Sequence, residues 1–201
     1  MTVIDRTIVT ILVVLILDNM TYGISEPFLP SNFEGKGISG TMIGLTQGSF
    51  AIAYMITAPL FGFFVNRVGH RNMIVMGLLL LSLSTAAFGA IEYLKTTQQI
   101  LGISITLRVL QGIASCMINT ASYSYAAQAY GNDVEKVVSL FEGFIGFGTT
   151  SGGVLGGLVY NALGFEKTFY VFGVIYVPLA IVVRFLVRTP KEFKEDTMDR
   201  A

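Results

Sequence analysis

Six long runs of apolar residues alternate with short polar segments along the chain. The runs cover residues 7–28, 42–64, 72–93, 99–123, 137–161 and 166–188. A helix needs about 20 mostly apolar residues to cross the hydrocarbon core of a bilayer. The pattern therefore predicts an all-α polytopic membrane protein, with a six-helix transmembrane domain over residues 1–188. Residues 189–201 are predicted to form a polar cytoplasmic tail or the start of a central linker.

The polar segments between the runs are short, and none has room for an inserted soluble domain. They lie at residues 31–40, 66–71, 92–98, 131–136 and 164–167. The first apolar run is too long for a signal peptide, contains Asp18 and lacks a small-residue cleavage site. We therefore expect it to be retained as the first helix.

Composition supports a membrane protein and excludes several other classes. Only 13% of the residues are charged, 53% are hydrophobic and the mean hydropathy is +0.67, whereas about a quarter of the residues in a soluble domain are charged. The net charge of zero argues against nucleic acid as a partner. Cys116 is the single cysteine, so neither a disulfide framework nor a CxxC metal site can form. We expect no cofactor, no metal, no catalytic residues and no enzymatic activity.

The positions of the cations predict an orientation. Lys and Arg are retained preferentially on the cytoplasmic side of a membrane. With the N-terminus inside, the cytoplasmic segments carry Arg6, Arg67, Arg71, Lys136, Arg184, Arg188, Lys191, Lys194 and Arg200, and the opposite side carries Lys36, Lys95 and Lys167. Both termini are therefore predicted to be cytoplasmic. His70 falls in the 66–71 segment, where we expect a solvated loop residue and not a proton relay.

The first predicted helix carries an ionisable group near the middle of the membrane. Asp18 lies about ten residues into the run, about 15 Å at 1.5 Å per residue. Tyr22 and Ser25 follow on the same helix face, Asn19 adjoins it, and Glu26 lies nearer the far surface. Buried charges in membranes usually face a bundle interior or a water-filled path. Asp18 is thus either a substrate or proton site or a carboxylate held by hydrogen bonds between helices, and Glu26 is either part of that site or interfacial.

The fourth run has a polar face along most of its length. Its members recur at helical spacing: Arg108, Gln111, Gly112, Ser115, Asn119, Ser122 and Tyr123. We expect this face to point into the bundle. An unpaired guanidinium would be costly there, so Arg108 should pair with an acid or with backbone carbonyls. The pair serves either proton coupling or structure alone.

The fifth run combines one acidic residue with many glycines. Glu142 lies one to two turns into the run and is followed by Gly148, Gly152, Gly153, Gly156 and Gly157. Small residues allow membrane helices to approach closely. Glu142 is therefore either a second acidic group in the Asp18 pathway or an interfacial residue beside a glycine packing seam.

Two segments resemble signatures of the major facilitator superfamily. The sequence from Gly62 to Arg71, GFFVNRVGHR, lies between the second and third runs and is similar to the family's loop signature. Gly62, Arg67, Gly69 and Arg71 match it, whereas Asn66 stands where the family usually has an acid. Arg108 to Gly112, RVLQG, resembles the family's second signature, which is associated with proton coupling. The resemblance implies a conformational role for the first segment and a coupling role for Arg108 and Gln111.

Within that superfamily the chain is most similar to the vesicular amine and polyamine transporters. Leu17 to Met20, LDNM, followed by Pro27 and Pro30, resembles their first helix, in which the aspartate recognises the amine or its exchanging proton. The sequence around Glu142, FEGF, is closer to the polyamine branch, and Phe50 replaces a lysine typical of the other branches. The glycine stretch after Glu142 lacks the proline of the family's antiporter signature.

The resemblance implies the N-terminal half of a proton-coupled carrier for an organic cation. The expected substrate and proton residues are Asp18, Asn19, Tyr22, Glu26, Asn119, Tyr123 and Glu142. Expected partners are the small cation, protons, the lipid bilayer and a second six-helix half, which belongs to the same chain, a dimer partner or a membrane complex. A vesicular or other organelle membrane is expected. The alternative is a degenerate half that serves as a structural subunit of a membrane assembly.

Overall fold

The structure is a computed structural model that describes residues 5–190, and these residues are almost entirely helical. No strand occurs among them, which confirms the all-α membrane class. The elements are α1 (Arg6–Gly35), α2 (Gly40–Val68), α3 (His70–Gly89), η1 (Ala90–Tyr93), α4 (Thr97–Tyr130), η2 (Gly131–Asp133) and α5 (Val134–Leu186). Most of the predicted polar tail, including Lys191, Lys194 and Arg200, lies outside the described residues.

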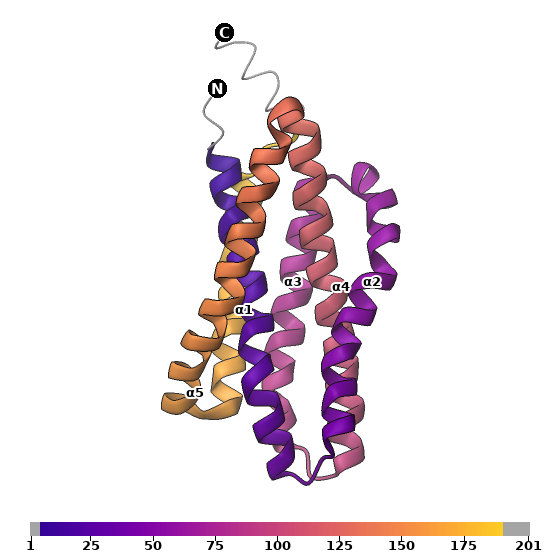
Figure 1. Cartoon of the computed structure of the whole chain (residues 1–201), viewed down its shortest axis with the longest axis vertical. Coiled ribbons are helices and arrows are strands. Elements are labelled where there is room, and N and C mark those ends of the chain that lie inside the picture. The colour runs from indigo at the N-terminus through magenta and orange to yellow at the C-terminus, as the bar shows by residue number, and fades with distance from the viewer. Residues whose placement is uncertain (1–4, 191–201) are drawn as a thin grey trace.

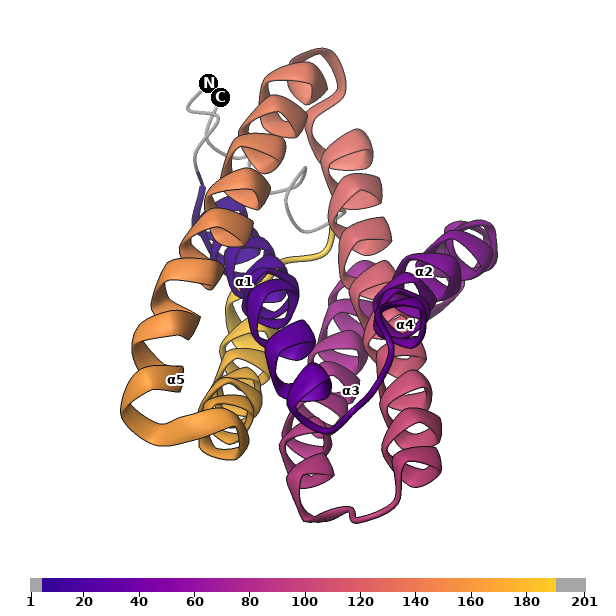
Figure 2. The same ribbon diagram turned by 60° about the horizontal axis from the view of Figure 1, so that its bottom comes forward.

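Glycines with positive φ make the tightest turns. Gly69 has φ 87° and is the only residue between α2 and α3. Gly164 has φ 81° and divides α5 into two helical segments, residues 134–163 and 165–186. Such dihedrals cost little only when the residue has no Cβ. The two segments of α5, orange and yellow in Figures 1 and 2, run in opposite directions. This reversal falls in the polar break predicted from the sequence at 164–167.

Four helical stretches of the described chain are long and apolar enough to cross a membrane. They are Arg6–Gly35, Gly40–Val68, His70–Tyr93 and Thr97–Leu186. The last spans 90 residues and contains α4, η2 and both segments of α5. Membrane-crossing length and composition are therefore present in every long helix, while the count of six spans stays a prediction.

The helices pack in pairs. α1 lies chiefly against α5, α2 against α4, and α3 against both α4 and α5 (Figure 1). Buried apolar side chains from α1, α3, α4 and α5 form the larger core cluster, and a second cluster fills the bundle toward the end that holds Gly164. α1 and α4, the two helices with polar faces, meet only over a short stretch, at Asp18.

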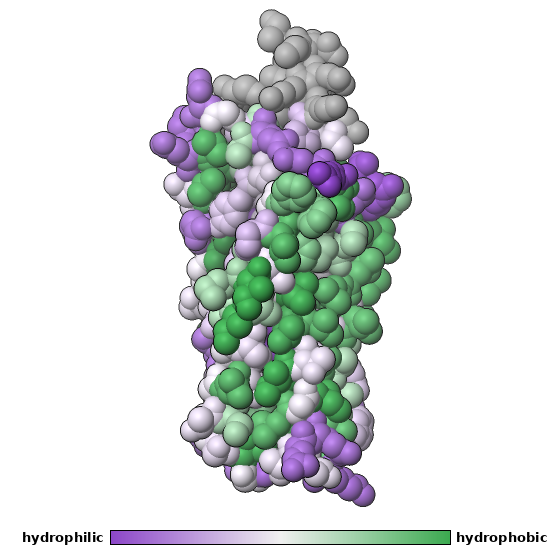
Figure 3. All heavy atoms as spheres, turned by 90° about the vertical axis from the view of Figure 1, so that its right-hand side faces the viewer, coloured by the Kyte–Doolittle hydropathy of each residue, from purple (hydrophilic) through white to green (hydrophobic). Residues whose placement is uncertain are grey.

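The surface is apolar where a soluble protein would be polar. Met55, Leu83 and Phe185 are 67%, 69% and 79% exposed, and Figure 3 shows apolar atoms over the middle of the molecule between hydrophilic ends. In contrast, Asp18 and Arg108 are each only 2% exposed. A continuous apolar exterior of this size is stable in lipid and not in water. The chain is an integral membrane protein.

Both ends of the described chain lie at one end of the bundle (Figure 1). The backbone N–H of Arg188 donates to Thr7 Oγ1 over 3.4 Å and joins them there. At the opposite end, an ion pair of 2.9 Å between Lys36 and Glu92 ties the end of α1 to η1. Which end faces the cytoplasm stays a prediction.

Candidate functional site

Asp18 is held in the bundle interior by two donors from α4. Its Oδ2 accepts hydrogen bonds from Ser115 Oγ (2.7 Å) and Asn119 Nδ2 (2.8 Å). Its Oδ1 is buried and has no hydrogen-bond partner within the described residues. One carboxylate oxygen of Asp18 therefore accepts two hydrogen bonds, and the other oxygen remains available for a proton or a water molecule.

The polar face of α4 points inward, as its spacing predicted. Ser115 and Asn119 are one helical turn apart, so both reach the same side chain of α1. Arg108, Gln111, Gly112 and Ser122 on the same face are also buried, and Tyr123 is partly buried. Ser115 and Asn119 of α4 thus meet Asp18 of α1 and satisfy one of its two carboxylate oxygens.

A cavity of about 330 Å³ opens beside this contact. Side chains from α1, α2, α4 and α5 line it: Asn19, Tyr22, Phe50, Tyr54, Ser115, Asn119, Tyr123, Glu142 and Ile145. The structure therefore brings together five of the residues predicted from the sequence: Asn19, Tyr22, Asn119, Tyr123 and Glu142. Asp18 is not in the lining but lies directly behind Ser115 and Asn119.

The cavity combines one carboxylate with aromatic rings. The Tyr123 hydroxyl donates to Glu142 Oε1, and the Tyr22 and Phe50 rings pack with centroids 5.3 Å apart. Carboxylates attract cations, and aromatic faces stabilise them through the ring quadrupole. The arrangement suits a small cation that also has apolar groups.

Sequence reasoning did not identify the contribution of α2 to this cavity. Phe50 and Tyr54 are one turn apart on α2 and line it from that side. Gly112 of α4 lets the backbone of α2 approach closely, because a Cβ there would clash with the Phe50 carbonyl. The i, i+4 spacing of two aromatic residues was the available signal, but the same spacing occurs in lipid-facing helices. Ser115 and Ile145 were also absent from the predicted set.

Arg108 lies outside the cavity in a separate buried cluster. Its Nη1 donates to Gln111 Oε1 (3.2 Å), and Gln111 Nε2 donates to Thr85 Oγ1 (3.3 Å). The guanidinium carbon lies 5.0 Å from the centre of the Phe88 ring. No acidic side chain lies within 4 Å of Arg108 in residues 5–190. The expected partner, an acid or backbone carbonyls, is thus replaced by the Gln111 amide and the Phe88 ring.

Glu26 is exposed and does not line the cavity. It lies one residue before Pro27, and Pro30 follows inside the same helix. Because Pro30 has no N–H, the Glu26 carbonyl loses its partner in the helix. Gln47 Nε2 of α2 donates to that carbonyl at 3.4 Å. In this conformation the backbone of Glu26, and not its carboxylate, connects α1 to α2.

The predicted glycines of α5 lie along α1. Gly148, Gly152 and Gly156 face Ile16, Met20 and Ile24, which are spaced by the same four residues. A Cβ on Gly148 or Gly152 would lie 2.5 Å from the carbonyl oxygen of its partner. Gly153 and Gly157 are at the edge of this contact and have more space. The first segment of α5 therefore packs backbone to backbone against the helix that carries Asp18.

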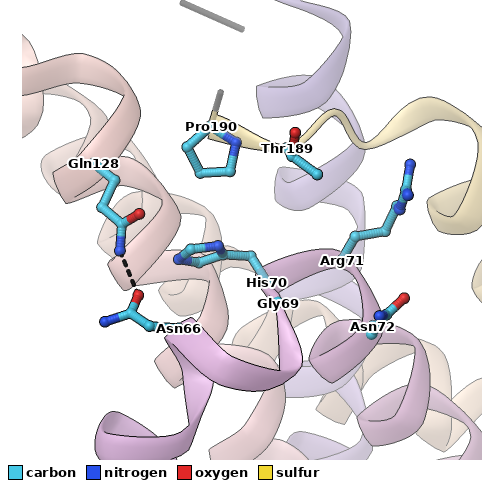
Figure 4. A pocket seen from close by; sticks show the side chains of 8 residues that line it. All are labelled: Asn66, Gly69, His70, Arg71, Asn72, Gln128, Thr189 and Pro190. Atoms are coloured by element: carbon cyan, nitrogen blue, oxygen red, sulfur yellow. Dashed lines mark hydrogen bonds between the residues drawn. The ribbon is translucent and has the colours of Figure 1, made fainter. Parts of the chain in front are cut away.

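The predicted loop signature forms the end of α2, the turn at Gly69 and the start of α3. Gly62 and Arg67 are exposed on α2, and Arg67 lies over the Phe63 ring at 4.7 Å. Asn66 Oδ1 accepts a hydrogen bond of 2.7 Å from Gln128 Nε2 of α4, as Figure 4 shows. Arg71 follows in the first turn of α3.

The expectation that His70 is solvated is wrong. His70 is the first residue of α3 and is only 6% exposed. Its Nε2 lies 3.1 Å from Ser124 Oγ, and its ring meets Tyr125 edge to face. The cause is the one-residue turn at Gly69, which leaves no loop that could carry His70 into solvent.

Within residues 5–190, no three His, Cys, Asp or Glu side chains are grouped so that they could hold a metal ion. Cys116 is buried and reduced.

Comparisons with known proteins agree with the motifs. The family described as Major Facilitator Superfamily matches residues 11–200. The chain is similar to the MFS-type transporter SLC18B1 of Mus musculus, with 32% identity over 167 residues, 82% of this chain and 36% of the relative. It is also similar to the probable vesicular acetylcholine transporter-B of Danio rerio (27% identity, 96% of this chain and 39% of the relative). Multidrug resistance protein 2 of Bacillus subtilis is 29% identical over 86% of this chain and 42% of the relative. The chain spans about two fifths of the length of these relatives.

Proposed function

Because the chain belongs to the major facilitator superfamily, we propose that it moves an organic cation, an amine or polyamine, across a membrane in exchange for protons. The observation that carries the proposal is the cavity between α1, α2, α4 and α5, where Glu142 meets aromatic rings. Asp18 lies behind this cavity and is connected to it by Ser115 and Asn119. One relative is named for acetylcholine, which is itself an organic cation.

In this proposal Glu142 contacts the cation directly. It is the one acidic side chain in the described lining, and Tyr123 fixes one of its oxygens through a hydrogen bond. Tyr22, Phe50 and Tyr54 add aromatic surface for the apolar parts of the amine. Asn19 and Asn119 provide amide groups for further hydrogen bonds.

Asp18 couples the cation to protons. Its negative charge attracts a cation to the cavity, whereas a proton on Asp18 removes that attraction. A proton and a cation that compete in this way lower each other's affinity by the same factor, which links their fluxes. Ser115 and Asn119 transmit the state of Asp18, because both contact the carboxylate and the cavity.

The test is uptake of a radiolabelled amine into proteoliposomes that hold the protein and carry a pH gradient. We expect Asp18→Asn to abolish gradient-driven uptake, because Asn119 and Ser115 still find an acceptor while the charge is lost. We expect Glu142→Gln to raise the concentration of amine needed for half-maximal uptake. Glu135→Gln is the matched control, because Glu135 lies on the exposed first turn of α5, outside the cavity lining.

Undiminished uptake by Asp18→Asn would overturn the coupling role, and equal effects of Glu135→Gln and Glu142→Gln would overturn the cavity assignment. Transport by this superfamily rocks one six-helix half against another around a midplane site. We therefore also propose that a second half completes the path, in the same polypeptide or in a partner, in an organelle membrane. The mass of the detergent-solubilised particle distinguishes these arrangements, and a large assembly without transport would favour a structural subunit.

A further inference from the structure

A second cavity lies at the end of the bundle where the described chain begins and ends. Its volume is about 530 Å³, and its lining comes from the end of α2, the start of α3, α4 and the segment after α5. The lining residues are Asn66, Gly69, His70, Arg71, Asn72, Gln128, Thr189 and Pro190, which Figure 4 shows. This cavity is separate from the one that Glu142 lines, since no residue is common to both.

The charged group in the described lining of this cavity is positive. Arg71 contributes a guanidinium, and none of the described lining residues is acidic. Arg71 Nε is buried and has no hydrogen-bond partner within the described residues. Neither Arg71 nor the neighbouring Arg67 has an acidic side chain within 4 Å in residues 5–190. A buried guanidinium donor without an acceptor is costly unless an anion or ordered water supplies one.

Asn66 supplies a further donor, and Gly69 leaves room for a ligand. Asn66 Oδ1 already accepts from Gln128 Nε2 at 2.7 Å, which leaves the Asn66 Nδ2 group as a donor. Gly69 has no Cβ, and the position where one would stand is open, with no atom within 4 Å. The Gly69 N–H already donates to the Val65 carbonyl at 2.9 Å, so this glycine contributes space for a ligand beside Asn66 and Arg71 and not a donor. Amide donors around a guanidinium are the groups that bind phosphate oxygens in proteins.

The position of the cavity along the membrane-crossing helices also favours a phosphate ligand. It lies at an end of the membrane-crossing helices, and the exposed Phe63 and Phe64 stand within one turn of Asn66 on α2. Lipid phosphates are at this depth in a bilayer, and free phosphate esters in water reach it too. We propose that the cavity between Asn66, Arg71 and Gln128 binds a phosphate group, from a lipid head group or from a soluble phosphate ester.

The experiment measures binding by the intact protein and does not depend on transport. Purified protein in phosphate-free detergent is titrated with inorganic phosphate, and affinity is read from calorimetry and from the rise in melting temperature. In parallel, protein in phosphatidylcholine nanodiscs with or without phosphatidic acid is examined by native mass spectrometry for retained lipid. Saturable binding in either arm supports the proposal, and the responding arm identifies the source of the phosphate.

Three variants distinguish binding in this cavity from attraction of phosphate to the overall positive charge of this end of the bundle. Arg71→Gln should weaken binding at least about tenfold, as expected for loss of a hydrogen bond to a charged group. Arg67→Gln is the matched control, because it removes the same charge four residues away and outside the cavity lining, and it should change affinity less than about twofold. Asn66→Asp keeps an acceptor for Gln128 but adds a negative charge, so it should weaken binding while the protein still folds.

Two results would overturn the site. One is the absence of saturable binding in both the phosphate and the phosphatidic acid arms. The other is an equal loss for Arg67→Gln and Arg71→Gln, which would mean that phosphate responds only to the total charge of this end. If Arg71→Gln does not fold, unchanged affinity in the Asn66→Asp variant would contradict the proposal by itself.

Discussion

The close approach of α1 and α5 can be tested by adding one methyl group. In a Gly152→Ala variant, the new Cβ would lie 2.5 Å from the carbonyl oxygen and 2.8 Å from the Cα of Met20. Both distances are well inside the 3.4 Å at which ordinary van der Waals contact begins. The clash is with backbone, so no side-chain rotation can relieve it. α1 would have to move away by roughly 1 Å, which breaks contacts on both sides of the interface.

The magnitude follows from two opposing effects. Overpacking of a tight interface costs about 1–3 kcal/mol, whereas replacing glycine by alanine inside a helix contributes about 0.5–1 kcal/mol of stability. The net loss for Gly152→Ala is therefore about 1–2 kcal/mol. For a chain of this size that corresponds to a fall in melting temperature of roughly 2–8 °C.

Gly146→Ala is the control for this measurement. Gly146 lies in the same segment of α5, and a Cβ there would meet no atom within 4 Å. Only the stabilisation of a helix by alanine relative to glycine remains, so this variant should melt roughly 1–4 °C above the parent. The assay is the thermal melting of detergent-purified protein, followed by circular dichroism and by loss of monodispersity. A Gly152→Ala protein that melts as high as Gly146→Ala would refute the backbone-to-backbone contact.

Two further substitutions test buried polar groups in the bundle. Tyr176→Phe removes the hydroxyl that donates to the Leu17 carbonyl at 2.7 Å, and we expect it to lower the stability of the same detergent-purified protein by about 1 kcal/mol. Arg108→Met removes a buried guanidinium that has no acid within 4 Å in the described chain, so we expect it to leave melting temperature unchanged or raised. Because the family resemblance implies a coupling role for Arg108, amine uptake by that variant should fall. A large loss of stability would contradict the expectation and show that the guanidinium has a strong partner.

The helices could be predicted because lipid imposes a simple length rule. Runs of about 20 apolar residues mark spans, and the first five predicted runs fall within helical residues of the structure, while the sixth, 166–188, ends two residues beyond Leu186, the last residue of α5. Helix ends were less predictable, since hydropathy measures the apolar part and not the helix itself. α1 continues through Pro27 and Pro30 to Gly35, beyond the predicted end at residue 28. Its freed Glu26 carbonyl finds Gln47 of α2, a contact between helices that a single-helix pattern cannot reveal.

The candidate site was predictable where it depends on one helix and not where it depends on two. Polar residues at helical spacing identified Asn119 and Tyr123, because polarity inside an apolar run is unusual. The sequence could not show that Asp18 is joined to Ser115, since the register between α1 and α4 depends on packing of the whole bundle. Tyr54 was missed because an aromatic residue in an apolar helix looks the same whether it faces lipid or a cavity.

The register between α1 and its neighbours is determined by contacts on two sides of the helix. On one side, Gly148 and Gly152 of α5 meet the backbone of α1 at Ile16 and Met20, and Gly156 makes room for the Ile24 side chain. On the other side, the Asp18 carboxylate accepts hydrogen bonds from Ser115 and Asn119. A shift of one residue along α1 would misalign the glycine contacts with Ile16, Met20 and Ile24 and move the acceptor away from α4 at the same time. The glycine contact therefore positions Asp18 beside the cavity, although no glycine touches the cavity itself.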